Sequence, residues 1–170
     1  EADAHTCVYT FISRQVEQIL GYTAQEWMEE PDFWQNHIHE EDRVEAFNFC
    51  QAKTIAGEDH RFEYRMMTAH GNAVWLQDIV SVIKNNGKPQ LLRGLTVDIT
   101  KQKLAEQEAK QSREQLQQIM DSSLDIICTV DEEGRFVNVS AASESIWGYR
   151  PQELRGRKFM DLVFPEDALN

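Results

Sequence analysis

The stretch "LLRGLTVDITKQKLAEQ", residues 91–107, changes its character at a single position. The apolar and β-branched run from Leu91 to Ile99 predicts a strand. At Thr100 the sequence becomes charged and rich in Gln, which predicts a helix, and no loop separates the two elements. A loop would isolate them mechanically, whereas a direct connection couples the helix to the sheet. We therefore expect this junction to transmit a change in the sheet to whatever follows the helix.

The chain is acidic, and this limits its partners. It carries 17 Lys and Arg against 29 Asp and Glu, a net charge of −12. Because such a surface repels phosphate backbones, we expect no nucleic-acid partner. No apolar run approaches the roughly 18 residues of a membrane span. The N-terminus lacks the basic start and apolar core of a secretory signal. We expect a cytoplasmic chain without direct membrane contact, from a parent that could itself be membrane-anchored.

Three cysteines, Cys7, Cys50 and Cys128, are far apart and form no Cys-x-x-Cys motif. An odd and scattered set predicts reduced thiols, in keeping with a cytoplasmic location.

The sequence contains a long repeat. The segment "SRQVEQILGYTAQEW" starts at Ser13 and "SAASESIWGYRPQEL" starts at Ser140, an offset of 127 with seven identities that include a Gly-Tyr pair. Further on, "HEED" at 39–42 corresponds to "FPED" at 164–167. A period this long indicates tandem domains, since solenoid repeats span roughly 20–50 residues.

The first copy predicts one strand, several short helices and then three antiparallel strands. Val16, Ile19 and Leu20 give a short helical face that Gly21 ends. The segment 40–57 opens with three acids, which suit a helix N-terminus. The other expected elements are a strand at 7–13, short helices at 24–29 and 32–38, and strands at 60–69, 73–84 and 90–99, the last three joined by hairpin turns.

The second copy supplies what the first lacks. Its segment "DIICTVDEEGRFVNVS", residues 125–140, predicts a strand, a turn and a second strand. The first copy begins at the equivalent of that second strand, so its own first strand is missing or unrecognised. We expect a first domain at 1–100, a linker helix at 101–122 and the N-terminal part of a second domain at 123–170.

Small and apolar residues recur in the linker with a period of 3.5 residues. The positions are Ala105, Ala109, Ser112, Leu116, Ile119 and Ser123. This seam predicts a homodimer through a marginal coiled coil, which a small free energy could shift between two arrangements. A single solvated linker helix fits the same charge pattern and stays open as an alternative.

Both copies resemble PAS sensor domains. In the first copy the motifs follow the family's order: "YTFIS" at 9–13, Gly21-Tyr22, "HEED" at 39–42, Tyr64-Arg65, Gly71, Trp75 and Asp98-Ile99-Thr100. The resemblance covers residues 7–103 and 113–170, with Glu40 where the family has Pro. It implies an α+β fold with a five-stranded antiparallel sheet and short helices on one face. With the first strand missing, the first copy would keep four strands and an unpaired edge.

In this family the space between sheet and helices holds a small ligand, a flavin, a haem or only side chains, and the helix after the last strand carries the signal. The resemblance therefore places the signal junction at Asp98, Ile99 and Thr100. We expect Asp98 to bond a partner on the neighbouring strand and Thr100 to cap the helix. Together they would set the angle at which the helix leaves the sheet.

Large side chains in the first copy are candidates to line a ligand pocket: Phe33, Trp34, Phe47, Tyr64, Met66 and Trp75. The alternative is that they only fill the core, which a domain of this size needs. In the family the haem ligand is a His on the long helix or the adjoining strand. Haem is disfavoured because residues 41–57 contain no His, and His60 and His70, which flank the next strand, are expected to be exposed. Cys50 lacks the Asn-Cys-Arg-Phe motif of photochemical relatives. We expect no cofactor or a non-covalent flavin in preference to haem.

His37 and His39 precede three acids, a set that could bind Zn²⁺ weakly. A helix N-terminus accounts for the acids as well, so we expect no metal site. Phosphate loops, Gly-x-Ser-x-Gly and His-Glu-x-x-His motifs are absent from the sequence, and we expect no catalytic residues. The chain is expected to be a sensing and relay module of a multidomain protein, most directly a sensor histidine kinase. The alternatives are a cofactor-free dimerisation and relay module or the input region of a diguanylate cyclase.

Overall fold

The computed structural model describes residues 1–163, so the predicted equivalence of "FPED" at 164–167 lies outside the described residues. The chain falls into two compact units, Glu1–Ala105 and Glu106–Asn170. Each unit has its own sheet and its own hydrophobic core.

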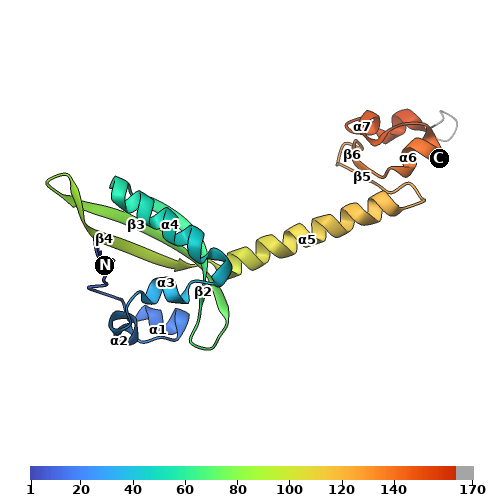
Figure 1. The fold of residues 1–170 in the computed structure, drawn as a ribbon. Coiled ribbons are helices and arrows are strands. Elements are labelled where there is room, and N and C mark those ends of the chain that lie inside the picture. Colours follow the sequence, from blue (N-terminus) through green and yellow to red (C-terminus); the bar gives the residue numbers. More distant parts are fainter. Residues whose placement is uncertain (164–170) are drawn as a thin grey trace. The chain divides into compact units, whose positions relative to one another are not determined.

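The first unit is built on a four-stranded antiparallel sheet (Figure 1). Its strands are β1 (Ala2–Asp3), β2 (His60–Met67), β3 (Ala73–Asn85) and β4 (Lys88–Asp98), in the order β1-β4-β3-β2. The long hairpin of β3 and β4 pairs Leu76 with Asp98 at one end and Asn85 with Lys88 at the other. Asn86 and Gly87 close this hairpin with positive φ angles of 51° and 79°, as a two-residue hairpin turn requires.

The N-terminal segment differs from the expectation in two ways. The first strand, expected to be missing or unrecognised, is present as β1, which pairs with β4. The strand expected at 7–13 is instead a single bridge between Tyr9 and Ala2. The reason is a tight turn, in which the Asp3 carboxylate accepts hydrogen bonds from the backbone N–H groups of His5 and Thr6. The sheet therefore has four strands and one bridge in place of five strands.

Short helices follow where the sequence predicts them. They are α1 (Gln15–Leu20), α2 (Ala24–Glu29) and α3 (Phe33–His37), followed by the long helix α4 (Glu40–Ala56). Gly21 ends α1 at φ 80°, where a residue with a Cβ would be strained. A capping box between Thr23 and Glu26 starts α2. Gly57 ends α4 at φ 67°.

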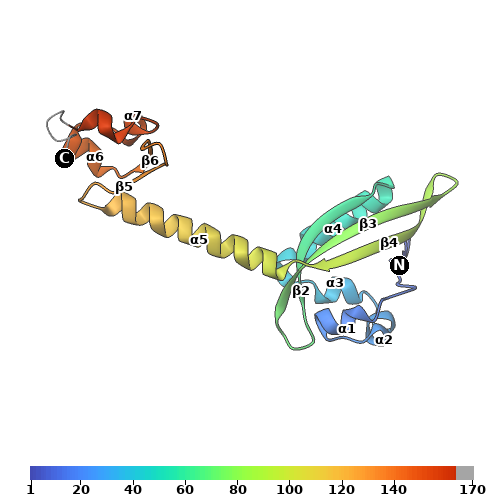
Figure 2. The same ribbon diagram turned by 180° about the vertical axis from the view of Figure 1, so that it is seen from behind.

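The core of the first unit lies between the sheet and these helices. Helix α4 runs along the sheet, and α1–α3 gather near one end of it (Figure 2). The buried cluster consists of Leu20, Trp27, Phe33, Ile38, Ala46, Tyr64, Met66 and Leu76. Phe33 is its centre, because its ring stacks on Trp27 at 4.5 Å and on His37 at 3.9 Å.

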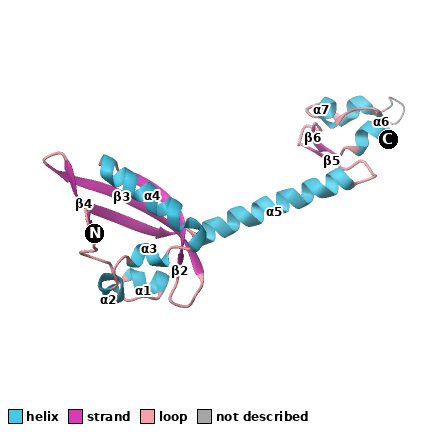
Figure 3. Ribbon diagram, in the orientation of Figure 1, coloured by secondary structure: helices cyan, strands magenta, loops and turns pink. Residues whose placement is uncertain are grey.

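Helix α5 (Thr100–Ser122) begins directly after β4, as Figure 3 shows. It has no buried residue along its length. Among the described residues, no helix is long and apolar enough to cross a membrane.

The second unit contains the predicted hairpin. Strands β5 (Cys128–Val130) and β6 (Phe136–Val139) pair, followed by α6 (Ala142–Trp147), α7 (Pro151–Leu154) and the 3₁₀ turn η1 (Phe159–Leu162). Gly148 ends α6 at φ 77°, as Gly21 ends α1. The repeat in the sequence is thus a repeat in the backbone. A small core of Phe136, Val139 and Leu154 holds this unit.

Candidate ligand cavity and helix junction

A cavity of about 610 Å³ lies in the first unit, between the sheet and the helices. The N-terminal segment, helices α1–α4 and strands β2–β4 all contribute residues to its lining. Ligand sites in proteins typically enclose roughly 300–1,000 Å³. The cavity therefore has the size of a small-molecule site.

Four of the six predicted pocket residues line this cavity: Phe33, Trp34, Phe47 and Tyr64. Met66 is instead fully buried in the core, beside the bridge that it forms with Ile38. Trp75 precedes the buried Leu76, and alternation along β3 turns its side chain to the opposite face of the sheet. The alternation of side chains along β3 could therefore have predicted from the sequence that Trp75 lies on the face away from the cavity.

A chain of hydrogen bonds crosses the cavity wall. The indole Nε1 of Trp34 donates to the Tyr64 hydroxyl at 2.8 Å, and that hydroxyl donates to Oδ2 of Asp78 at 2.9 Å. Thr96 donates to the other carboxylate oxygen of Asp78 at 2.6 Å. The chain joins α3, β2, β3 and β4. Sequence reasoning missed Asp78 and Thr96, although a lone acid within the apolar run of β3 is a detectable signal.

Asp78 is enclosed by protein, and the surface it keeps accessible faces the cavity. Burial raises the pKa of its carboxyl above the ordinary value of 3.8, against the opposing effect of the hydrogen bonds from Thr96 and Tyr64. Burial also raises the pKa of the Tyr64 hydroxyl far above its usual range, and the nearby Asp78 carboxylate adds to this effect. Tyr64 therefore stays protonated as the donor.

Cys50 also lines the cavity. Burial raises the pKa of its thiol to about 11, so the thiolate is scarce at neutral pH. Cys50 thus offers the cavity a small, soft and unreactive surface.

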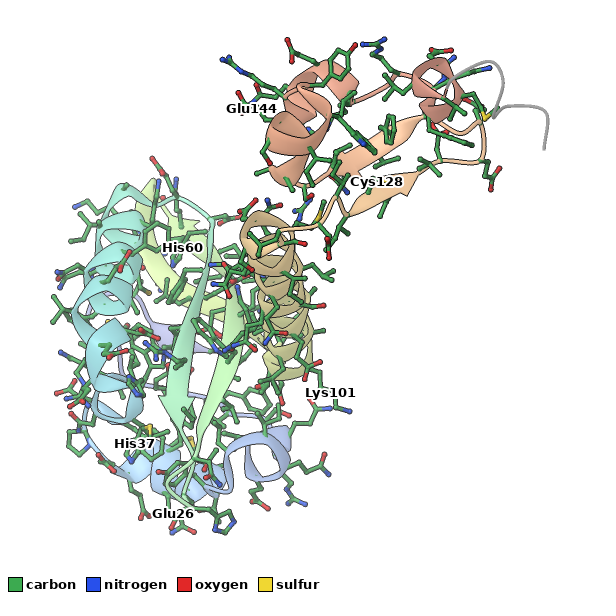
Figure 4. All side chains as sticks on the ribbon, turned by 90° about the vertical axis from the view of Figure 1, so that its right-hand side faces the viewer. Glu26, His37, His60, Lys101, Cys128 and Glu144 are labelled. Carbon is green, nitrogen blue, oxygen red and sulfur yellow. The ribbon has the colours of Figure 1, made fainter. Side chains whose placement is uncertain are left out.

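The predicted histidine and acid cluster is already engaged in contacts within the protein. Donor atoms of His39, Glu41 and Asp42 lie within 4.8 Å of one another. Asp42 nevertheless holds the Arg65 guanidinium at 2.6 Å, and the Nδ1 atom of His39 accepts the backbone N–H of Glu41. His37 is turned into the aromatic core on Phe33, and Figure 4 shows it toward the end of the first unit away from His60. These contacts give the acids a structural role at the start of α4.

The junction residues exchange the roles expected of them. The Asp98 carboxylate accepts the backbone N–H of Thr100 at 2.8 Å, so Asp98 holds the first turn of α5. The Thr100 hydroxyl accepts the backbone N–H of Trp75 at 3.0 Å, so Thr100 ties the helix to β3. Ile99 is buried, and its N–H donates to the carbonyl of Trp75 at 2.9 Å.

A second layer of contacts surrounds this junction, and sequence reasoning missed it. Lys103 on α5 forms an ion pair with Glu63 on β2 at 2.6 Å, and its ammonium lies 5.2 Å from the centre of the Trp75 ring. The guanidinium of Arg65 lies 5.4 Å from the same ring and is bound by Asp42 of α4. Contacts therefore run continuously from α4 through Arg65 and Trp75 to the first turn of α5.

The predicted linker seam lies on α5 with its residues exposed. Ala105, Ala109, Leu116 and Ile119 are all exposed, with Leu116 at 60% and Ile119 at 57% of their maximal surface. Exposed apolar side chains on a helix are available to a partner.

We predict that Asp78→Asn makes the protein more stable at neutral pH relative to acid. The raised pKa of Asp78 means that the folded state resists ionisation of this carboxyl, so native stability falls as pH rises above the ordinary value of 3.8. Asn removes this penalty. The melting temperature of the variant minus that of the native chain should therefore increase as pH rises from 4 to 7. Thermal unfolding across this range measures the difference.

Asp42→Asn is the matched control with the opposite sign. The hydrogen bond from Arg65 lowers the pKa of Asp42, so this acid stabilises the fold above pH 3.8 and that contribution is lost as pH falls through the lowered value. This variant should lose most stability at neutral pH. Parallel pH curves for the two variants would contradict the assignment of Asp78.

Comparison with known proteins agrees with this geometry. Residues 9–96 and residues 114–169 each match the PAS fold family. The two-component sensor PprA of Pseudomonas aeruginosa is 29% identical over 165 residues, which cover 93% of this chain and 17% of the relative. The chain thus spans only a small part of that protein.

Two solved structures share the fold. The N-terminal domain of a diguanylate cyclase with PAS/PAC sensor from Marinobacter aquaeolei is 29% identical, with a TM-score of 0.57 over 59% of this chain and 93% of that one. A sensory box histidine kinase/response regulator from Burkholderia thailandensis is 26% identical, with a TM-score of 0.53 over 64% of this chain and 81% of that one. The prediction of an α+β PAS fold is confirmed, and the chain belongs to the PAS family as a tandem PAS sensor region.

Proposed function

We propose that the chain is the sensing and relay module of a multidomain signalling protein, in which a ligand in the cavity shifts the sheet and α5. The observation that carries this proposal is that the cavity and the junction share two strands. On β3, Asp78 faces the cavity and Trp75 holds Thr100. On β4, Thr96 binds Asp78, and Asp98 lies two residues further on. A ligand that moves Asp78 therefore acts on the strands that orient the helix.

The cavity itself favours a ligand over the cofactor-free alternative. Large apolar residues of its lining, Val8, Phe11 and Met28, are exposed, so the cavity is open to solvent and has the size of a small-molecule site. A module that only relays a signal through a filled core has no need of about 610 Å³ of open space. A non-covalent flavin stays ahead of haem in this proposal. Haem would need a His ligand from α4 or the adjoining strand, whereas His5 of the N-terminal segment is the one His among the described residues that line the cavity.

For the effector we propose a histidine kinase, because the curated relative is a two-component sensor and one of the solved relatives is a histidine kinase. A diguanylate cyclase is the second candidate, favoured by the other solved relative. In either case catalysis would belong to another part of the parent protein. We place the proposed module in the cytoplasm, where the three free cysteines would stay reduced.

We also propose that α5 pairs with α5 of a second copy, which would give a homodimer. The apolar seam of Leu116 and Ile119 is exposed, and a second copy would cover it. Such a pair would let a tilt of α5 at the junction become a change in the packing of two helices.

We predict that Gly94→Phe abolishes ligand binding while the fold persists. Gly94 lines the cavity on β4, has an ordinary φ, and a Cβ built on it meets no atom within 4 Å. A phenyl ring there should occupy the space of the ligand without a clash. Absorption spectra and mass spectrometry of molecules released on denaturation should show a stoichiometric ligand in the native protein and none in the variant.

Ser81→Phe serves as the control, because Ser81 is an exposed residue of β3. It adds the same ring outside the cavity and should leave the ligand in place. If the native protein binds no small molecule and the parent protein of the Gly94→Phe variant still responds normally, the cofactor-free relay is the better description.

We predict that Asp98→Ala uncouples output from input. The substitution removes the carboxylate that holds the N–H of Thr100, at a cost of about 1 kcal/mol, as for other helix caps. The fold should survive, whereas the effector activity of the parent protein should lose most of its response to the stimulus. A kinase or cyclase assay with and without stimulus measures this response.

Asp59→Ala is the matched control. Like Asp98, Asp59 accepts a backbone N–H through its carboxylate, but its donor is Val82 on β3, at 2.8 Å and away from the junction. It should cost comparable stability and leave the response intact. An unchanged response in the Asp98 variant would remove the main support for the junction model.

We predict that Leu116→Lys weakens self-association by about tenfold or more, because it places a charge in the seam. Gln118→Lys adds the same charge to α5 outside the seam and should have little effect. Light scattering over a dilution series gives the dissociation constant for each chain. Equal masses for all three chains at every concentration would refute the paired helix.

A further inference from the structure

The charged side chains that line the cavity are mainly acidic. Among the described residues that line it, five are acids and none is Lys or Arg, although the chain contains 17 of these bases. The acids are Glu1, Glu29, Glu30, Asp32 and Asp78. Arg93 pairs with Glu1 at 2.8 Å, whereas no Lys or Arg among the described residues forms an ion pair with the other four acids. The lining therefore disfavours carboxylate and phosphate ligands.

The same cavity is rich in aromatic rings. Eight of its lining residues are aromatic: Tyr9, Phe11, Trp27, Phe33, Trp34, Phe47, Phe62 and Tyr64. The faces of such rings attract cations through the ring quadrupole, most strongly when water is excluded. Clustered rings and acids together form the chemistry by which proteins recognise organic ammonium groups.

Asp78 is a polar group of this lining whose carboxylate can accept further hydrogen bonds. Its two oxygens accept one hydrogen bond each, from Tyr64 and Thr96, whereas an ionised carboxylate offers about four acceptor sites. Among the described residues, none forms an ion pair with Asp78. A buried acid without a cationic partner destabilises a protein unless something else supplies the charge.

The groups around Asp78 do not supply it. Tyr64 and His60 of β2, Tyr9 of the N-terminal segment and Cys50 of α4 are the titratable groups whose charges act on Asp78 or are acted on by it. Of these only His60 can become a cation, and it acts on Asp78 without forming an ion pair with it, while its Nδ1 atom is engaged with the carbonyl of Glu58 at 2.9 Å. The missing charge can come from a ligand.

We propose that the cavity binds a small organic cation with an apolar body, whose ammonium group lies against the Asp78 carboxylate and the surrounding aromatic rings. This inference rests on the proposed function, because it takes the cavity to be the ligand site of the sensor. It names the chemical class of the ligand as amine and disfavours the phosphate of a flavin nucleotide and the propionates of haem. A flavin without phosphate stays compatible with the charge of the lining.

The test uses three probes of nearly equal size and different charge: tryptamine, tryptophol and indole-3-propionate. Isothermal titration calorimetry at pH 7 on the full 170-residue chain gives their affinities. We expect the cationic amine to bind roughly tenfold or more tightly than the neutral alcohol, as a desolvated cation–π contact together with an ion pair allows. The anionic acid should bind most weakly.

The Asp78→Asn variant assigns the preference to this residue. It should lower the affinity for tryptamine to that for tryptophol and leave tryptophol almost unchanged. Glu58→Gln, an exposed acid outside the cavity, is the control and should change neither affinity. The probe series on the native chain stands even if the Asp78 variant folds poorly.

The outcomes separate the two proposals. If the alcohol or the acid binds as tightly as the amine and Gly94→Phe abolishes that binding, the cation inference is overturned and ligand sensing stands. If no probe binds and no molecule is released from the native protein, both proposals fail. If the amine is preferred and Asp78→Asn keeps the preference, Asp78 is not the anchor and the inference is overturned.

Discussion

The structure depends on the hydrogen bonds that fasten the start of α5 to β3. The N–H and carbonyl of Trp75 both contact the chain beyond β4, the first through the Thr100 hydroxyl and the second through the N–H of Ile99. Two bonds from one residue fix a direction, because a single bond would leave the helix free to pivot. Burial of Ile99 and the ion pair of Lys103 with Glu63 add to this attachment. The sheet and the first turn of α5 thus behave as one stiff element.

In the proposed function, a ligand of complementary charge would offset the cost of burying Asp78 in the first unit. Asp78 is an acid placed where its charge is disfavoured, and it is held there by Tyr64 and Thr96. Such a site is less stable empty than filled by a group of complementary charge, because the energy of binding includes relief of the burial penalty. The residues that hold Asp78 belong to the strands that meet the junction. In the proposed function, ligand recognition and signal relay would therefore depend on the same few residues.

The sequence predicts the fold well and the site in part. Helix ends at Gly21 and Gly57 and the turn at Gly87 were predictable because local backbone chemistry decides them. The tandem organisation was predictable because the motifs recur in order. The roles of Asp98 and Thr100 were exchanged, because both can accept a backbone N–H and only the angle between helix and sheet decides which one each receives. Trp75 was assigned to the pocket on its size, whereas its position in the alternation of β3 turns it away. Lys103 and Glu63 are distant in sequence, and no local pattern pairs them.

The tryptophans of the first unit lie in two different environments, so their fluorescence can report two events separately. Trp27 and Trp34 line the cavity, and Trp75 lies on the other face of the sheet beside the cations of Arg65 and Lys103. The fluorescence of an indole depends on the polarity and charge around it. A ligand in the cavity would therefore change the emission of Trp27 and Trp34, and a movement of α5 would change that of Trp75. Single replacement of each indole by phenylalanine would resolve the two signals in time. The order in which they change would then distinguish a helix that follows the ligand from one that moves first and admits it.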